Sequence, residues 1–151
     1  MFKVCITGTT RGLGKELKSY FLKKGYFVIG LNKGDNIVDL AVGCNLFINN
    51  AYGDGMQIDV FDALFPRIKN IVVMGSVAAD FPDPDMPEYS QHKKELKDRV
   101  LEVANTSDSN VLLLQLTGES YNNPELIGKA IDFWLENPTV TSMTFVHGEK
   151  N

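Results

Sequence analysis

The first 31 residues contain the pattern that most restricts the fold. A short apolar run, FKVCIT (2–7), leads into a turn that contains three glycines. A segment with apolar residues at helical spacing follows at 14–25, and a second apolar run, YFVIGL, occupies 26–31. Strand, helix and strand in this order form a βαβ unit, from which parallel sheets are built. The sequence therefore predicts an α/β fold.

The alternation of apolar runs and helical patterns continues along the chain. The later runs are continuous rather than alternating, as expected for strands that are covered on both faces. A weak run lies at 36–40 and stronger ones at 45–49, 70–75, 110–116 and 142–148, with helical patterns at 57–68, 88–104 and 124–137. Only the proline-rich stretch 80–89 interrupts this order, and we expect it to be an irregular loop near a site. We expect residues 1–151 to form one domain with a doubly wound parallel sheet and helices on both faces.

Composition narrows the possible functions. The net charge of -4 argues against a nucleic-acid-binding surface, because phosphate binding requires clustered Lys and Arg. No apolar run approaches the roughly 20 residues of a membrane span, and the N-terminus does not resemble a signal peptide. We therefore expect a cytoplasmic protein with neither nucleic acid nor membrane as partner. Cys5 and Cys44 lie in apolar stretches and are expected to be core residues rather than a disulfide or a reactive thiol.

The glycines Gly8, Gly12 and Gly14 follow the order T-G-x-x-x-G-x-G between the first strand and the first helix. Glycine permits positive φ in a tight turn and lets a pyrophosphate approach the N–H groups of a helix N-terminus. A plain turn without a ligand is the alternative. A P-loop is excluded, because five rather than four residues separate Gly8 from Gly14, and Glu16 follows Lys15 where a serine or threonine is required.

Further motifs follow in order along the chain. NNAYG occupies 49–53, Ser76 follows the run at 70–75, and Tyr89 and Lys93 lie in YSQHK, with Tyr89 thirteen residues after Ser76. Together with TGTTRGLG (7–14) and the dipeptide DL (39–40), these motifs resemble those of the short-chain dehydrogenases and reductases, in register over nearly the whole chain.

The resemblance implies a Rossmann-type dinucleotide-binding domain with a nicotinamide cofactor. In that family the glycine loop binds the cofactor, an acidic dipeptide holds adenine, and the lysine of Tyr-x-x-x-Lys holds the ribose. Thr117 and Gly118 stand where the family has Pro-Gly. The cofactor-binding residues that the resemblance and the residue types indicate are Gly8, Thr10, Arg11, Gly12, Leu13, Gly14, Asn32, Lys33, Asp39, Leu40, Asn50, Ala51, Lys93, Thr117 and Gly118.

Ser76, Tyr89 and Lys93 are the candidate catalytic residues. Tyr89 and Lys93 are four residues apart, so on a helix they lie on one face about 6 Å apart. The ammonium group stabilises a tyrosinate and so makes the phenol a better proton donor. Ser76 ends a predicted parallel strand, where its hydroxyl can donate to a carbonyl oxygen. The alternative is a surface tyrosine and lysine on an exposed helix.

The end of the second strand indicates which nicotinamide cofactor binds. An aspartate that holds both ribose hydroxyls would favour NAD, but Asn32 and Lys33 stand there, and Arg11 adds a second positive charge nearby. A 2'-phosphate fits these residues, so we expect NADP(H). Two solvated surface cations are the alternative.

The chain departs from the family pattern at two places. The segment between NNAYG and Ser76 is short and lacks the family's relay asparagine, for which Asp59 or Gln57 could stand in. The substrate-binding insertion after Thr117-Gly118 is reduced to ESYNNPE (119–125), a small lid. Between the second strand and the run at 45–49, we expect a third strand at 36–40 with hardly room for a crossover helix.

Two functions from different classes remain. The first is an NADP(H)-dependent oxidoreductase acting on a carbonyl or alcohol, and the second is a catalytically weak nucleotide-binding sensor or partner module. The family usually associates through its late helices and last strand, which implies a homodimer or homotetramer. The candidate interface residues are Leu96, Val100, Phe133 and Trp134.

Overall fold

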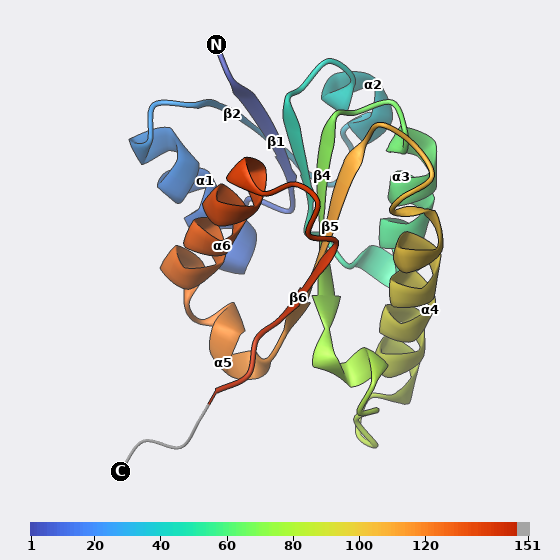
Figure 1. Ribbon diagram of the computed structural model, residues 1–151. Helices are drawn as coiled ribbons and strands as arrows, with labels where there is room; N and C mark the ends of the chain where they lie inside the picture. The colour runs from blue at the N-terminus through green and yellow to red at the C-terminus, as the bar shows by residue number, and fades with distance from the viewer. Residues whose placement is uncertain (148–151) are drawn as a thin grey trace.

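A single parallel sheet of six strands organises the molecule, which is a computed structural model that describes residues 1–147 (Figure 1). The strand order is β2-β1-β3-β4-β5-β6. The chain therefore adds β2 on one side of β1 and then returns to add β3 on the other, which makes a doubly wound sheet with its switch point between β1 and β3. The strands are β1 (Lys3–Thr7), β2 (Phe27–Leu31), β3 (Leu46–Asn49), β4 (Asn70–Ser76), β5 (Asn110–Leu116) and β6 (Ser142–Thr144). The predicted fold class is confirmed; Gly148, at the end of the predicted run 142–148, lies outside the described residues.

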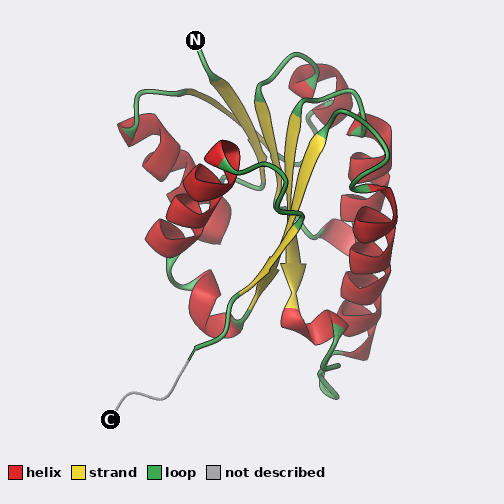
Figure 2. Cartoon of the chain, viewed as in Figure 1, coloured by secondary structure: helices red, strands yellow, loops and turns green. Residues whose placement is uncertain are grey.

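Helices cover both faces of the sheet, as Figure 2 shows. One face carries α1 (Gly12–Lys23) and α6 (Pro124–Glu136), and the other carries α2 (Ile37–Ala41), α3 (Met56–Leu64) and α4 (Pro87–Val103). Short helical turns lie near the carboxyl ends of the strands: η1 (Gly53–Gly55), η2 (Val77–Ala79) and α5 (Gly118–Tyr121). Pro87 belongs to the first turn of α4, where its missing N–H costs nothing, so the irregular loop ends before it rather than at 89.

Two apolar clusters fill the space between the sheet and its helices. Strand residues alternate between them: Cys5 faces the cluster under α3 and α4, whereas Val4 and Ile6 face the cluster under α1 and α6. This explains why the strands are apolar throughout. Cys5 and Cys44 are free, buried thiols in one cluster, as expected from the sequence.

The interpretation of 36–40 as a third strand is wrong, because residues 37–41 form helix α2. The side chain of Asn36 accepts a hydrogen bond from the backbone N–H of Asp39 and begins the helix. Ile37 and Val38 pack against the core cluster that contains Ala41, which is a helical spacing. The crossover from β2 to β3 is therefore this short helix.

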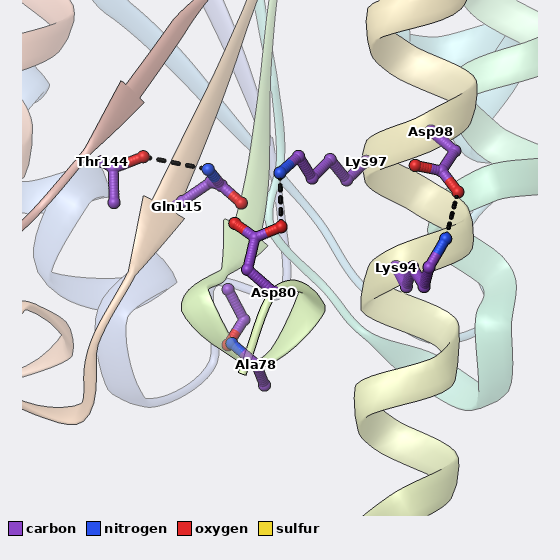
Figure 3. Close-up of polar contacts among 8 residues, drawn as sticks. Ala78, Asp80, Lys94, Lys97, Asp98, Gln115 and Thr144 are labelled. Carbon is purple, nitrogen blue, oxygen red and sulfur yellow. Dashed lines mark hydrogen bonds and ion pairs between the residues drawn. The ribbon is translucent and has the colours of Figure 1, made fainter. Parts of the chain in front are cut away.

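Three of the four predicted interface residues lie in the core. Leu96 and Val100 lie on the inward face of α4, and Trp134 lies on the inward face of α6. Each has at most 1% of its surface exposed. Only Phe133 is exposed, at 54%. The outward face of α4 instead carries charges that are paired within this chain, such as Lys94 with Asp98 (Figure 3).

Candidate active site

The glycine loop closes tightly on itself at the switch point. Gly8 and Gly12 have positive φ angles of 74° and 62°, and a Cβ on Gly14 would lie 2.0 Å from the carbonyl oxygen of Gly8. No larger residue fits at Gly14 without displacing the loop. Arg11 occupies the N-cap position of α1 without a side-chain hydrogen bond to the first turn. The N–H groups at the start of α1 are therefore available to an anion.

The ends of β1 and β3 are joined by a clasp of hydrogen bonds. The Thr7 Oγ1 atom accepts from the backbone N–H groups of Asn50, at 2.9 Å, and Ala51, at 3.0 Å, while Asn50 Nδ2 donates to the Thr7 carbonyl. Within the described residues the buried Asn50 Oδ1 has no hydrogen-bond partner. Because a buried acceptor without a donor is costly, this atom suits a polar ligand at the switch point. The glycine cradle and this free acceptor both fit a dinucleotide.

The side chain of Asn32, at the end of β2, is hydrogen-bonded to the glycine loop. Its Oδ1 atom accepts from the Thr9 backbone N–H at 2.8 Å, and its own N–H donates to Asp35 Oδ2 at 2.7 Å. Lys33 and Arg11 are both exposed, as the prediction of a phosphate-binding pair requires. The sequence interpretation missed Asp35, an exposed carboxylate at the same strand end.

Asp39 and Leu40, the predicted adenine-binding dipeptide, lie on helix α2 rather than after a strand. Asp39 is exposed and accepts a hydrogen bond from the side chain of Asn36, and Leu40 is 48% exposed. In the glycine loop Thr10 is exposed and Leu13 is buried in the core.

The three predicted catalytic residues come from the end of β4 and the start of α4. Ser76 is buried at the carboxyl end of β4, and its Oγ atom accepts from the Ala78 N–H at 3.0 Å. Tyr89 is half-buried in the first turns of α4, and Lys93 is buried one turn later. The Lys93 Nζ atom lies 5.5 Å from the centre of the Tyr89 ring. The predicted Tyr-Lys pair on one helix face is present.

The ammonium of Lys93 is held by neutral acceptors in the protein interior. Its Nζ atom donates to Gln57 Oε1 at 2.8 Å and to the Met74 carbonyl at 2.9 Å. Gln57 is itself buried and donates to the carbonyls of Asn49 and Met74, both at 2.9 Å. Burial lowers the pKa of Lys93 to about 8, because removing an ammonium from water disfavours its charged form.

Gln57, rather than Asp59, is therefore the residue that contacts Lys93. The sequence left these two residues open as replacements for the missing relay asparagine. Gln57 faces inward from the first turn of α3, whereas Asp59 is exposed.

Tyr52 and His92 also belong to this cluster, although the sequence interpretation gave them no role. The Tyr52 ring centre lies 5.2 Å from that of Tyr89 and 5.6 Å from Lys93 Nζ. The Tyr52 hydroxyl and His92 Nδ1 are 2.9 Å apart and share a hydrogen bond. The only signal in the sequence was the position of Tyr52 within the motif NNAYG (49–53).

The segments after β4 and β5 border this cluster. Asp80 is anchored to α4 by Lys97 at 2.5 Å (Figure 3), and the Asp83 N–H donates to Ser90 Oγ. Thr117 and Ser120 form a reciprocal capping box at the start of α5, which Gly118 begins. Tyr121, at the end of α5, has its pKa raised by burial and then by the neighbouring Tyr89.

Neither a membrane-spanning helix nor a cluster of metal-binding side chains is present among residues 1–147. No helix within 1–147 combines the length and the apolar character that a membrane crossing requires. Over the same range, no three His, Cys, Asp or Glu side chains gather where they could bind a metal ion.

Solved structures with the same architecture are numerous. No protein-family model matches the sequence, and no curated protein matches it. A 4-hydroxyisoleucine dehydrogenase complexed with NADH and succinate superposes with a TM-score of 0.75 at 16% identity, covering 96% of this chain and 98% of that one. A 3-ketoacyl-(acyl-carrier-protein) reductase from Brucella melitensis complexed with NADH gives 0.69 at 16% identity over 94% and 95%. A short-chain dehydrogenase/reductase described as a glucose/ribitol dehydrogenase, also from Brucella melitensis, gives 0.73 at 14% identity over 95% and 94%. The chain therefore has the fold of the short-chain dehydrogenases and reductases.

Proposed function

We propose that this chain is an NADP(H)-dependent oxidoreductase of the short-chain dehydrogenase/reductase type, which transfers hydride between the nicotinamide and a carbonyl or alcohol substrate. The observation that carries the proposal is the pair of half-buried Tyr89 and buried Lys93, which donates to the Met74 carbonyl two residues before Ser76. The pair lies at the same sheet edge as the glycine loop. A buried lysine that faces a tyrosine at a sheet edge is costly for stability, and a catalytic role accounts for it.

The cofactor would lie across the switch point between β1 and β3. Its pyrophosphate would meet the N–H groups at the start of α1, beside Gly12 and Gly14, and Asn50 Oδ1 would accept a hydrogen bond from a hydroxyl or amide group of the cofactor. When bound, a reduced nicotinamide supplies the hydride, and the protein's residues handle the proton.

Each catalytic side chain has a distinct task in carbonyl reduction. Tyr89 donates its phenolic proton to the substrate oxygen as the carbonyl carbon becomes an alcohol carbon. Lys93 stabilises the resulting tyrosinate, with one ammonium hydrogen left over after Gln57 and Met74 have taken two. Ser76 donates a hydrogen bond to the substrate oxygen, and its Oγ atom can accept the Ala78 N–H while it does so.

The preference for NADP(H) over NAD(H) rests on exposed charges. Arg11 and Lys33 lie at the loop and at the end of β2, where they would bind a 2'-phosphate. Asp35 opposes them, because a carboxylate there repels a phosphate and can accept from ribose hydroxyls. Two cations against one carboxylate favour the phosphate.

A binding module with little catalysis is the second candidate. The observation that favours it is the size of α5, which covers only Gly118–Tyr121 and leaves little structure to enclose a substrate. Such a module would bind the cofactor without turnover.

The decisive experiment compares the parent with Tyr89→Phe in NADPH oxidation against a panel of aldehydes and ketones. We expect the parent to turn over, and Tyr89→Phe to bind NADPH equally well while its turnover falls by about 10²-fold or more. Cofactor binding without turnover of any carbonyl or alcohol by the parent would favour the binding module. Equal turnover by Tyr89→Phe would contradict the assigned proton donor.

We also propose that the protein is cytoplasmic and that it assembles into a homodimer or homotetramer. Phe133 is the one interface residue predicted from the sequence that is available on the surface.

A further inference from the structure

Tyr89 must regain a proton after every reduction. The two groups that accept hydrogen bonds from Lys93 cannot supply this proton. Lys93 is 2% exposed, and its Nζ atom donates to an amide oxygen of Gln57 and a backbone carbonyl of Met74. Neither acceptor carries an acidic proton that it could give back. A proton therefore has to reach the pair from another direction.

Tyr52 is the titratable side chain that contacts both members of the pair. Its ring lies 5.2 Å from the Tyr89 ring and 5.6 Å from Lys93 Nζ. Its hydroxyl shares a 2.9 Å hydrogen bond with Nδ1 of His92, whose side chain is only partly buried. Tyr52 thus links the buried pair to an imidazole that reaches the surface.

A small cavity joins these groups. It has a volume of about 10 Å³ and is lined by side chains from the loop after β3, from α3 and from α4, among them Tyr52, Gln57, His92 and Lys93. This volume is about the least that a single water molecule requires, and a water there would bridge polar groups that are too far apart for a direct hydrogen bond.

We propose that Tyr52 and His92 form a proton relay that returns a proton from solvent to Lys93 and Tyr89 after each reduction; the inference rests on the proposed function. His92 gains a proton at Nε2 from solvent and releases one from Nδ1 to the Tyr52 oxygen. Lys93 gives a proton to the Tyr89 phenolate oxygen and then regains one from the water, which in turn takes the Tyr52 hydroxyl proton. Tyr52, the water and Lys93 each end with as many protons as they began with, and one proton has moved from solvent to Tyr89 without any change of oxidation state. His92 is left as its Nε2–H tautomer, and rotation of its partly exposed ring or exchange with solvent restores the Nδ1–H form before the next turnover.

Other titratable groups near His92 come from its own helix and from the loop after β3. Glu88 and Glu95 are exposed within about one turn of it, and Tyr89 lies one turn before it. The loop after β3 contributes Tyr52, and Lys93 lines the same cavity.

Rapid-mixing kinetics of the cofactor-loaded protein test the relay. In His92→Ala the first turnover uses the proton already on Tyr89, so we expect a normal burst of one NADPH oxidised per site. Later turnovers should slow by about tenfold or more, and added imidazole should restore most of the loss. His147→Ala is the matched control, because His147 pairs with Glu119 of α5 and, within residues 1–147, has no contact with Tyr52 or Lys93; this variant should leave both phases unchanged.

The two kinetic phases distinguish a relay through His92 from a purely structural role of that side chain. A slowed first turnover in His92→Ala would indicate the structural role and overturn the relay. Equal steady-state rates without an imidazole effect would also overturn the relay while leaving the proposed function intact. A parent without any turnover would contradict the proposed function instead.

A readout without cofactor also tests the link between Tyr52 and His92. The ¹⁵N resonance of His92 Nδ1 should move in Tyr52→Phe, because the substitution removes the hydroxyl that lies 2.9 Å from this nitrogen, while the resonance of His147 stays. An unmoved His92 resonance would overturn the Tyr52-His92 link.

Discussion

Replacing Lys93 with methionine removes a buried charge and keeps the volume of the side chain. Lys93 is 2% exposed, and burial lowers its pKa from 10.5 to about 8. The substitution also removes the donor to Gln57 Oε1, whereas the Met74 carbonyl keeps a second donor, Gln57 Nε2. Methionine does not titrate, so the pH dependence of the difference between the two proteins reports the titration of Lys93.

The sign follows from the two protonation states. Below pH 8 Lys93 is charged in both folded and unfolded protein, so the folded state bears the full desolvation cost. Between pH 8 and 10.5 the folded protein releases the proton first, so the parent's free energy of unfolding rises with pH relative to that of the variant. With these two pKa values, the difference changes by roughly 2 to 3 kcal/mol between pH 7 and pH 10.

Urea unfolding of the parent and Lys93→Met at pH 7 and pH 10 measures this change. The variant's stability relative to the parent should be greatest at pH 7 and should fall by pH 10. Lys94→Met is the matched control, because Lys94 is exposed beside Asp98 and should show no comparable change. If the difference between the parent and Lys93→Met is the same at both pH values, Lys93 does not carry a destabilised buried charge and the reasoning fails.

Three further predictions follow from the loop and the surface. Gly14→Ala puts a Cβ within 2.0 Å of the Gly8 oxygen, so we expect fluorescence titration to show at least a tenfold loss of NADPH affinity (about 1.4 kcal/mol), and unchanged affinity would contradict the cradle. NADPH should bind about five- to a hundredfold more tightly than NADH, as charge-assisted hydrogen bonds to Arg11 and Lys33 imply. Equal or tighter NADH binding in the same titration would refute the cofactor preference. Light scattering should give a dimer or tetramer at micromolar concentration, and a monomer of 16.8 kDa would contradict the proposed assembly.

Local sequence signals were sufficient for most of the fold. The six-stranded parallel sheet follows from continuous apolar runs, and the glycine turn follows from residues that alone tolerate its backbone. The prediction of a strand at 36–40 was wrong because five residues are too few to distinguish the two-residue period of a strand from the 3.6-residue period of a helix. Only the Asn36 cap and the packing of Ile37 and Val38 decide for a helix.

Contacts between distant segments were beyond the reach of sequence patterns. Gln57 meets Lys93 across 36 residues, and Tyr52 meets His92 across 40, without any periodic signal in between. For the same reason, apolar positions on α4 could not be divided between core and partner surface, and Leu96 and Val100 were placed at an interface. By contrast, the Tyr89-Lys93 pair lies within one helix, so its spacing alone placed the two side chains together.

Deuteride transfer tests the central claim most directly. The parent protein is incubated with NADPH that carries deuterium at the transferred position of C4, together with a carbonyl substrate from the panel, and the alcohol product is analysed by mass spectrometry. Hydride transfer at the Tyr89-Lys93 site predicts one deuterium in each alcohol molecule from the parent, and about 10²-fold less product from Tyr89→Phe at equal cofactor occupancy. An alcohol without deuterium, or no alcohol from any member of the panel, would contradict hydride transfer as the function of this site.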